Sequence, residues 1–206
     1  MTDWQTLSEQ VRSRVLAGNA GTAVAFAAMT AERLMRLDPQ GLPFTQSLRP
    51  LLDLVWRAAA GDQTAFKPIA VALGEFYISE YCHNDGQEGP DDADDDPAAA
   101  ILFAAECYLH AEPRFAAYVA GRAIDDVERR MDLASEDYTG DEAIDADAAM
   151  AAEARQQRAD LDALARYATN LSRARFGLPA DEREHLLAAL RDMVTVPTPI
   201  RSTCEG

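Results

Sequence analysis

Two pairs of acidic residues with a spacing of three are the first feature of this sequence that could support chemistry. The pairs are Asp125 with Glu128 and, after thirteen intervening residues, Glu142 with Asp145. Carboxylates three residues apart share one face of a helix. Two such pairs on neighbouring helices can jointly hold Mg²⁺ against a phosphate group, because Mg²⁺ prefers oxygen ligands.

This pattern loosely imitates the E-x-x-E and E-x-x-D pairs of all-helical, metal-dependent nucleotide pyrophosphohydrolases. However, Arg129 and Arg130 directly follow the first pair and are expected to form ion pairs with it. A chain with 35 acidic residues also produces such matches easily. A divergent magnesium-dependent nucleotide phosphohydrolase is therefore the alternative hypothesis, and not the leading one.

The acidic residues are concentrated in two segments that contain no basic residue. The first segment holds Asp85, Glu88, Asp91, Asp92, Asp94, Asp95 and Asp96. The second holds Asp132, Glu136, Asp137, Asp141, Glu142, Asp145 and Asp147. Without these 14 residues the chain has 21 acidic and 19 basic residues, so the net charge of −16 falls to −2. The negative charge is thus concentrated in these two segments, and the rest of the chain is nearly neutral.

These segments have two interpretations. They can be solvated loops that keep the protein soluble, or an anionic surface that recruits a basic macromolecule and sets specificity. The leading hypothesis is the second: a non-enzymatic binding protein with an immunity- or inhibitor-type role toward a basic protein. The residues expected to contact that partner are Asp91, Asp92, Asp94, Asp95, Asp96, Glu136 and Asp137.

Metal and nucleophile motifs are weak. Glu80 and His83 have the spacing of a diiron ligand pair, but a ferritin-like site needs a second such pair, and only one exists. The acidic run from Asp91 lacks the glycine that a calcium-binding EF-hand loop requires. There is no G-x-S-x-G, P-loop or G-x-G-x-x-G motif. The sequence therefore predicts no metal site and no cofactor.

Charge and cysteine content restrict the partners and the compartment. A net charge of −16 repels nucleic acid and anionic membranes, so neither is an expected partner. The cysteines Cys82, Cys107 and Cys204 are odd in number and include no C-x-x-C, which fits free thiols in the cytoplasm. Cys82 and Cys107 stand beside apolar residues and are expected to be buried.

Apolar residues recur at spacings of three and four along almost the whole chain, which predicts an all-α, single-domain bundle of about seven to eight helices over 1–193. The tail 194–206 contains prolines. Expected helices include 68–83, one that Asp96 caps with Pro97 in its first turn, and a continuous one from Met150 to Phe176. The acidic segments Asn84–Asp96 and Asp132–Thr139 are expected to be loops.

A heptad-like series of apolar residues marks the longest predicted helix. It comprises Met150, Ala154, Gln157, Leu161, Leu164, Ala168 and Leu171. Such a series can form a coiled-coil dimer or pack inside a bundle, and we expect the second. The protein is therefore predicted to be a monomer or a homodimer.

Four stretches resemble an uncharacterised bacterial all-helical family typified by the enterobacterial protein YjaG. They are Phe26–Arg33, Leu51–Trp56, Pro97–Leu109 and Glu153–Leu164. The resemblance implies a compact all-α fold but no established activity, so no catalytic role is carried over. Within the second stretch, we expect Trp56 to be a core residue and Asp53 to bind a neighbouring helix, with Arg33 as the candidate partner.

Overall fold

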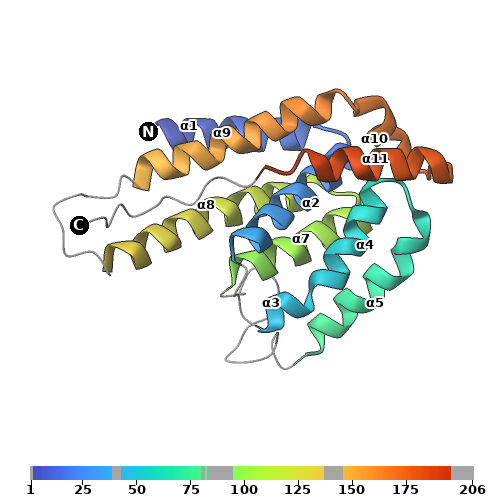
Figure 1. Cartoon of the computed structure of the whole chain (residues 1–206), viewed down its shortest axis with the longest axis horizontal. Coiled ribbons are helices and arrows are strands. Elements are labelled where there is room, and N and C mark those ends of the chain that lie inside the picture. The colour runs from blue at the N-terminus through green and yellow to red at the C-terminus, as the bar shows by residue number, and fades with distance from the viewer. Residues whose placement is uncertain (1, 39–42, 80–81, 83–94, 137–145, 196–206) are drawn as a thin grey trace.

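The computed structural model describes residues 2–38, 43–79, 82, 95–136 and 146–195 (Figure 1). Its helices are α1 Asp3–Ala17, α2 Ala20–Leu37, α3 Pro43–Ser47, α4 Arg49–Ala59, α5 Phe66–Tyr77, α7 Asp96–His110, α8 Pro113–Glu136, α9 Ala146–Ala165, α10 Ala168–Ala174 and α11 Ala180–Asp192, with a 3₁₀ turn at Gln63–Ala65. The described residues contain no strand, which confirms the all-α prediction.

The described part of the chain has ten α-helices, whereas the sequence predicted seven to eight. The short helix α3 was not expected, because five residues carry almost no periodic signal. The predicted helix from Met150 to Phe176 is instead divided into α9 and α10. These two differences account for the larger number.

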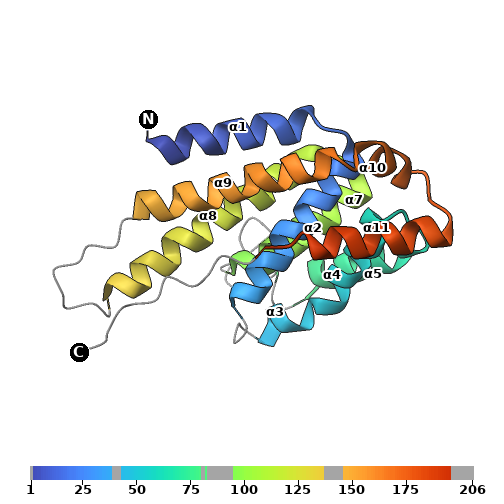
Figure 2. The same cartoon turned by 45° about the horizontal axis from the view of Figure 1, so that its top comes forward.

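The centre of the molecule is α2, which contacts helices on all sides (Figures 1 and 2). Every residue from Ala23 to Met35 is buried. The antiparallel partners α7 and α8 pack against it, while α1 and α9 lie side by side along one edge and α4 lies on another. The buried residues of α2 are mostly apolar, and a helix with apolar residues on all sides is stable only when other helices cover it in this way.

The break between α9 and α10 redirects the chain over the start of α2. At the break, the amides of Arg166 and Tyr167 donate to carbonyls three residues earlier, which tightens the last turn. Ala168 is exposed, so the heptad-like series does not continue along one face. Beyond the break, Leu171 is fully buried against the core. The buried members of the series therefore pack inside the bundle.

Helix ends near the acidic segments also differ from the prediction. Helix α7 begins one residue after Asp95, which is its cap in place of Asp96. Helix α8 continues to Glu136, so the loop predicted from Asp132 begins later. Helix α5 ends at Tyr77 and not near residue 83.

Apolar packing forms one large core and one smaller cluster. The large core contains the fully buried Trp56, as expected, and both Cys82 and Cys107 are buried and free. Burial raises the pKa of Cys107 to about 12. The smaller cluster joins α8 and α9 through Ile124 and Met150, and Trp4 of α1 packs against it. Within the described residues, no helix has both the length and the apolar character needed to cross a membrane.

Candidate functional site

The residues predicted to form the acidic surface do not share one environment. Asp91, Asp92, Asp94 and Asp137 lie outside the described residues, as do Glu142 and Asp145 of the alternative carboxylate pairs. Glu136 is the last residue of α8. Asp95 and Asp96 are described, and each is only 6% exposed. The expectation that these two aspartates belong to an exposed acidic surface is therefore wrong.

Asp95 is buried because it caps helix α7. Its carboxylate accepts the backbone N–H of Ala98 at 3.2 Å and a hydrogen bond from the hydroxyl of Thr45, which is itself fully buried on α3. A capping carboxylate satisfies backbone N–H groups that the first helical turn leaves without partners. Asp95 thus positions α7 and joins it to α3.

Asp96 joins α7 to α8. Its two carboxylate oxygens lie 3.4 Å from a guanidinium nitrogen of Arg122 and 3.3 Å from one of Arg129. Because α7 and α8 are antiparallel neighbours, this contact places the start of α7 beside the second half of α8 (Figure 1). The chain between α5 and α7, which holds the first acidic segment, therefore meets the bundle at Asp96.

The buried carboxylate of Asp126 forms ion pairs with Arg129 and Arg130. It lies 2.5 Å from Arg129 and 2.7 Å from Arg130. The two arginines were expected to pair with Asp125 and Glu128, and this expectation is wrong. Burial of Asp126 raises its pKa, because desolvation and the nearby Asp96 outweigh the attraction of the two guanidinium groups.

Asp125 and Glu128 lie one turn apart on the exposed face of α8. Partial burial raises the pKa of Asp125, and the negative charges of Asp96 and Glu128 add to this effect while Arg122 opposes it. Within the described part of the chain, no three His, Cys, Asp or Glu side chains are grouped closely enough to hold a metal ion. The pair offers two oxygen donors on a helix surface.

The first acidic segment ends near the part of α8 that leads into the second. Arg129, which contacts Asp96, lies seven residues before Glu136, or about 10 Å along the axis of α8. The first segment rejoins the bundle at Asp96, and the second leaves it after Glu136. The fold thus brings together the attachment points of two segments that are far apart in sequence.

A buried ionic cluster at the centre of the bundle was not predicted. Arg33 of α2, which is fully buried, lies 2.8 Å from Glu153 and 2.7 Å from Asp160, both on α9. Gln157 donates to Glu153 and to the carbonyl of Ala120 on α8, both at 3.1 Å. The only sequence signal for this cluster was the polar Gln157 inside an otherwise apolar series.

Arg33 therefore does not bind Asp53, contrary to the prediction. Asp53 accepts hydrogen bonds from Arg49 at 3.2 Å and from Arg191 of α11 at 2.7 Å. The indole of Trp56 donates to Glu32, at 3.1 Å. The bond between Trp56 and Glu32 is buried and joins α4 to α2, whereas the partly exposed Asp53 joins α4 to α11.

Glu106 and His110 lie on α7, the next described helix after the Glu80 and His83 pair, and their side chains contact each other. His110 Nε2 lies 2.7 Å from Glu106 on the same helix, and the hydroxyl of Tyr77 donates to the other Glu106 oxygen at 2.5 Å. Glu80 and His83 are outside the described residues. The side chain of Glu106 thus ties α5 to α7.

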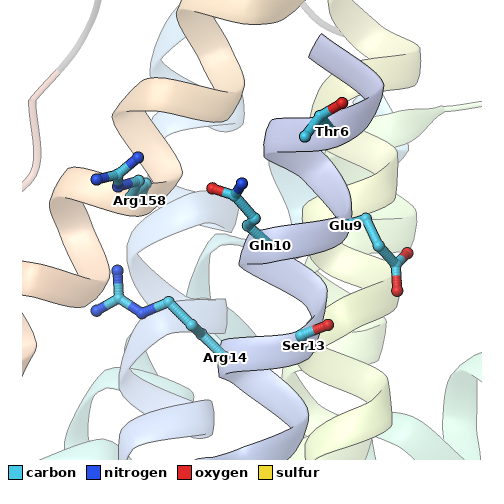
Figure 3. A pocket seen from close by; sticks show the side chains of 6 residues that line it. All are labelled: Thr6, Glu9, Gln10, Ser13, Arg14 and Arg158. Carbon is cyan, nitrogen blue, oxygen red and sulfur yellow. The ribbon is translucent and has the colours of Figure 1, made fainter. Parts of the chain in front are cut away.

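A shallow groove of about 580 Å³ runs between α1 and α9 (Figure 3). Figure 3 shows Gln10 and Arg14 of α1 near Arg158 of α9, while Glu9 projects from another side of α1. Arg14 is already paired with Asp162, at 2.8 Å. The groove is broad and open to solvent.

Comparisons of the chain with models of protein families, with curated proteins and with solved structures find no match. The function proposed below therefore rests on the residues and contacts of this chain alone.

Proposed function

We propose that this protein is a non-enzymatic binding protein whose acidic segments attract a basic macromolecular partner. The observation that supports this most strongly is the contact of Asp96 with Arg122 and Arg129, which holds the end of the first segment against α8, about 10 Å along the helix axis from the start of the second. Two acidic segments that attach to neighbouring parts of the bundle can contact the same partner. Clustered carboxylates also accelerate encounter with a basic surface.

The charges of the surrounding body support the same proposal. Arg122, Arg129 and Arg130 of α8 all contact the buried carboxylates Asp96 and Asp126. These cations therefore neutralise Asp96, the last residue of the first segment, and Asp126, which belongs to neither segment. We place the protein in the cytoplasm and expect an immunity- or inhibitor-type interaction with a basic protein.

The acidic segments are tested by reversing Asp91, Asp92 and Asp94 to lysine, leaving the buried Asp95 and Asp96 intact. Affinity capture from the source lysate, at low and at high salt, is followed by mass spectrometry. Wild type is expected to enrich a basic protein that high salt releases, because salt screens exposed charges. The triple variant is expected to lose that protein while its helical circular dichroism is unchanged.

A matched control reverses three exposed acids elsewhere, Asp181, Glu184 and Asp192 of α11, which have no ion pair in the described part of the chain. This variant changes the net charge by the same amount and should capture the partner as wild type does. Equal capture by both triple variants and wild type would reject the acidic-segment proposal.

One observation favours the alternative, a divergent magnesium-dependent nucleotide phosphohydrolase. Because Arg129 and Arg130 bind Asp126, the carboxylates of Asp125 and Glu128 are not taken by them. This alternative predicts nucleotide hydrolysis that requires Mg²⁺ and disappears in Glu128→Gln. The absence of turnover across a broad nucleotide panel would end it.

The last two proposals concern the protein family and the oligomeric state. We propose membership of the YjaG-type helical family on the four stretches quoted above, and this adds no residue role. We also propose a monomer or a homodimer. Light scattering with refractive-index detection measures the mass directly, and any larger assembly contradicts this.

A further inference from the structure

A cavity of about 190 Å³ lies at the end of α7 remote from Asp96, among α2, α4, α5, α7 and α10. Tyr108, on its wall, is twelve residues beyond Asp96, or about 18 Å along the helix. The space exists because small residues line it, including Ala20, Gly21 and Ala58. The cavity is therefore separate from the acidic end.

Most of the cavity wall is apolar. Val24 and Ala58 are buried residues of the main core, and Leu109 packs against that core. Two aromatic rings complete the wall: Phe66 and Tyr108 meet edge to face, with ring centroids 6.2 Å apart. Phe66 is 51% exposed, an unusual position for a phenylalanine beside an accessible cavity. An apolar body would cover part of this ring and gain contact with both aromatic side chains.

Two polar groups on the wall have no partner among the described residues. The guanidinium of Arg175 is exposed and forms no ion pair there, and the hydroxyl of Tyr108 forms no hydrogen bond there. Burial, with the negative charge of Asp62, raises the pKa of Tyr108, so its hydroxyl stays protonated at neutral pH and can donate. No carboxylate lines the cavity.

We propose that this cavity binds a small apolar carboxylate, with its ring or short chain against Phe66 and Tyr108 and its carboxylate at Arg175. The combination of an apolar wall with a few polar groups is typical of small-molecule sites, and drug-sized ligands occupy clefts of roughly 300–1,000 Å³. A cavity of about 190 Å³ accordingly takes a smaller molecule, with one ring or a short aliphatic chain. A guanidinium and a hydroxyl are suited to a carboxylate.

The proposal is tested by titrating the full chain with benzoate and with hexanoate while recording methyl and aromatic NMR spectra. We expect saturable shifts of Ala20, Leu109 and Phe66 resonances at millimolar or lower ligand concentration. Benzamide, which has the same ring and no charge, is expected to bind at least tenfold more weakly. Equal binding of benzoate and benzamide would overturn the carboxylate assignment, and no saturable shift at these residues would overturn the site.

Variants separate the cavity from general effects. Arg175→Gln removes the charge at an exposed position and should weaken benzoate but not benzamide, whereas Arg158→Gln in the groove between α1 and α9 should change neither. Ala20→Leu fills the cavity from a half-buried position and should weaken both ligands. Unchanged benzoate affinity in Arg175→Gln and Ala20→Leu, with native circular dichroism, would contradict the proposal.

Discussion

Adjacent residues on α2 carry the two buried ionic contacts that orient this helix. Glu32, only 3% exposed, faces α4, where it accepts from Trp56 and lies 2.9 Å from Arg49. Arg33 faces α9 and its two carboxylates. Buried charges are costly to leave without partners. Each contact therefore specifies which helix packs on which side of α2.

Replacing Arg33 tests the contact with α9. Arg33→Met leaves the carboxylates of Glu153 and Asp160 buried without their cation, so we expect unfolding free energy to fall by about 3–5 kcal/mol in urea denaturation. The control is Arg155→Met, which breaks an exposed ion pair with Asp3 and should cost at most about 1 kcal/mol. Similar losses of unfolding free energy in Arg33→Met and Arg155→Met would contradict the prediction that the buried contacts of Arg33 stabilise the fold more than an exposed ion pair does.

The contact of Glu32 makes stability depend on pH. Burial alone would raise the pKa of Glu32, but hydrogen bonds from Arg49, Arg36 and Trp56 more than offset it, so the folded-state pKa is lowered. The ionised carboxylate therefore stabilises the fold above the ordinary glutamate pKa of about 4.3, and this stability is lost as pH falls through the folded-state value.

Glu32→Gln is therefore expected to lose about 2 kcal/mol of unfolding free energy at neutral pH. The loss should shrink below about pH 4, as wild-type Glu32 becomes protonated. Urea denaturation at a series of pH values measures this difference. Glu184→Gln, at an exposed position of α11, is the control and should change the unfolding free energy little. A loss of unfolding free energy in Glu32→Gln that became larger at lower pH would contradict the predicted direction of the pH dependence.

At the scale of the elements, α10 passes very close to the start of α2. A Cβ atom added at Gly21 would lie 1.9 Å from the carbonyl oxygen of Leu171. That oxygen is part of the backbone, so it cannot move without displacing α10. The small residue at position 21 is what allows α10 to cross the start of α2.

Gly21→Ala is expected to lower the unfolding free energy by about 1–3 kcal/mol through overpacking. Gly121→Ala is the matched control, since nothing lies within 4 Å of the added Cβ on helix α8. Alanine loses less backbone entropy than glycine in a helix, so this variant should gain about 0.5–1 kcal/mol. Thermal or urea denaturation of the pair measures both signs. If both Gly21→Ala and Gly121→Ala stabilised the protein, the close approach of α10 to α2 would be contradicted.

At the scale of the molecule, the two apolar clusters share helices α8 and α9 and are expected to unfold together. Val119 of α8 belongs to the large core and Ile124 to the smaller cluster. Trp56 reports on the first and Trp4 on the second. The chain has only these two tryptophans, so each can be observed alone.

In Trp4→Phe, fluorescence follows Trp56, and in Trp56→Phe it follows Trp4. Each variant is expected to show a fluorescence midpoint in urea equal to its own circular dichroism midpoint, which is the behaviour of a single two-state domain. Each serves as the other's control, because the comparison is internal to one variant. If the fluorescence of Trp4 changed at a lower urea concentration than the circular dichroism did, residues 1–193 would consist of two folding units and not one.

Local sequence signals were sufficient for most of the helices and for the main core residues. Apolar residues spaced three and four apart predicted the all-α fold, and the burial of Trp56, Cys82 and Cys107 was predicted from the sequence. Pro97 lies in the first turn of α7, as the sequence predicted. These features depend on contacts within a few residues, and a sequence pattern contains that information.

Partners between distant helices were decided only by the tertiary structure. Arg33 pairs with residues 120 or more positions away, and no local pattern chooses among 35 acidic residues for it. Asp95 and Asp96 belong to a long acidic run, yet packing of α7 against α3 and α8 buries them. Position along the chain does not determine which carboxylates face water. The assembled helices do, because burial of a charge is tolerated only where another element supplies its partner.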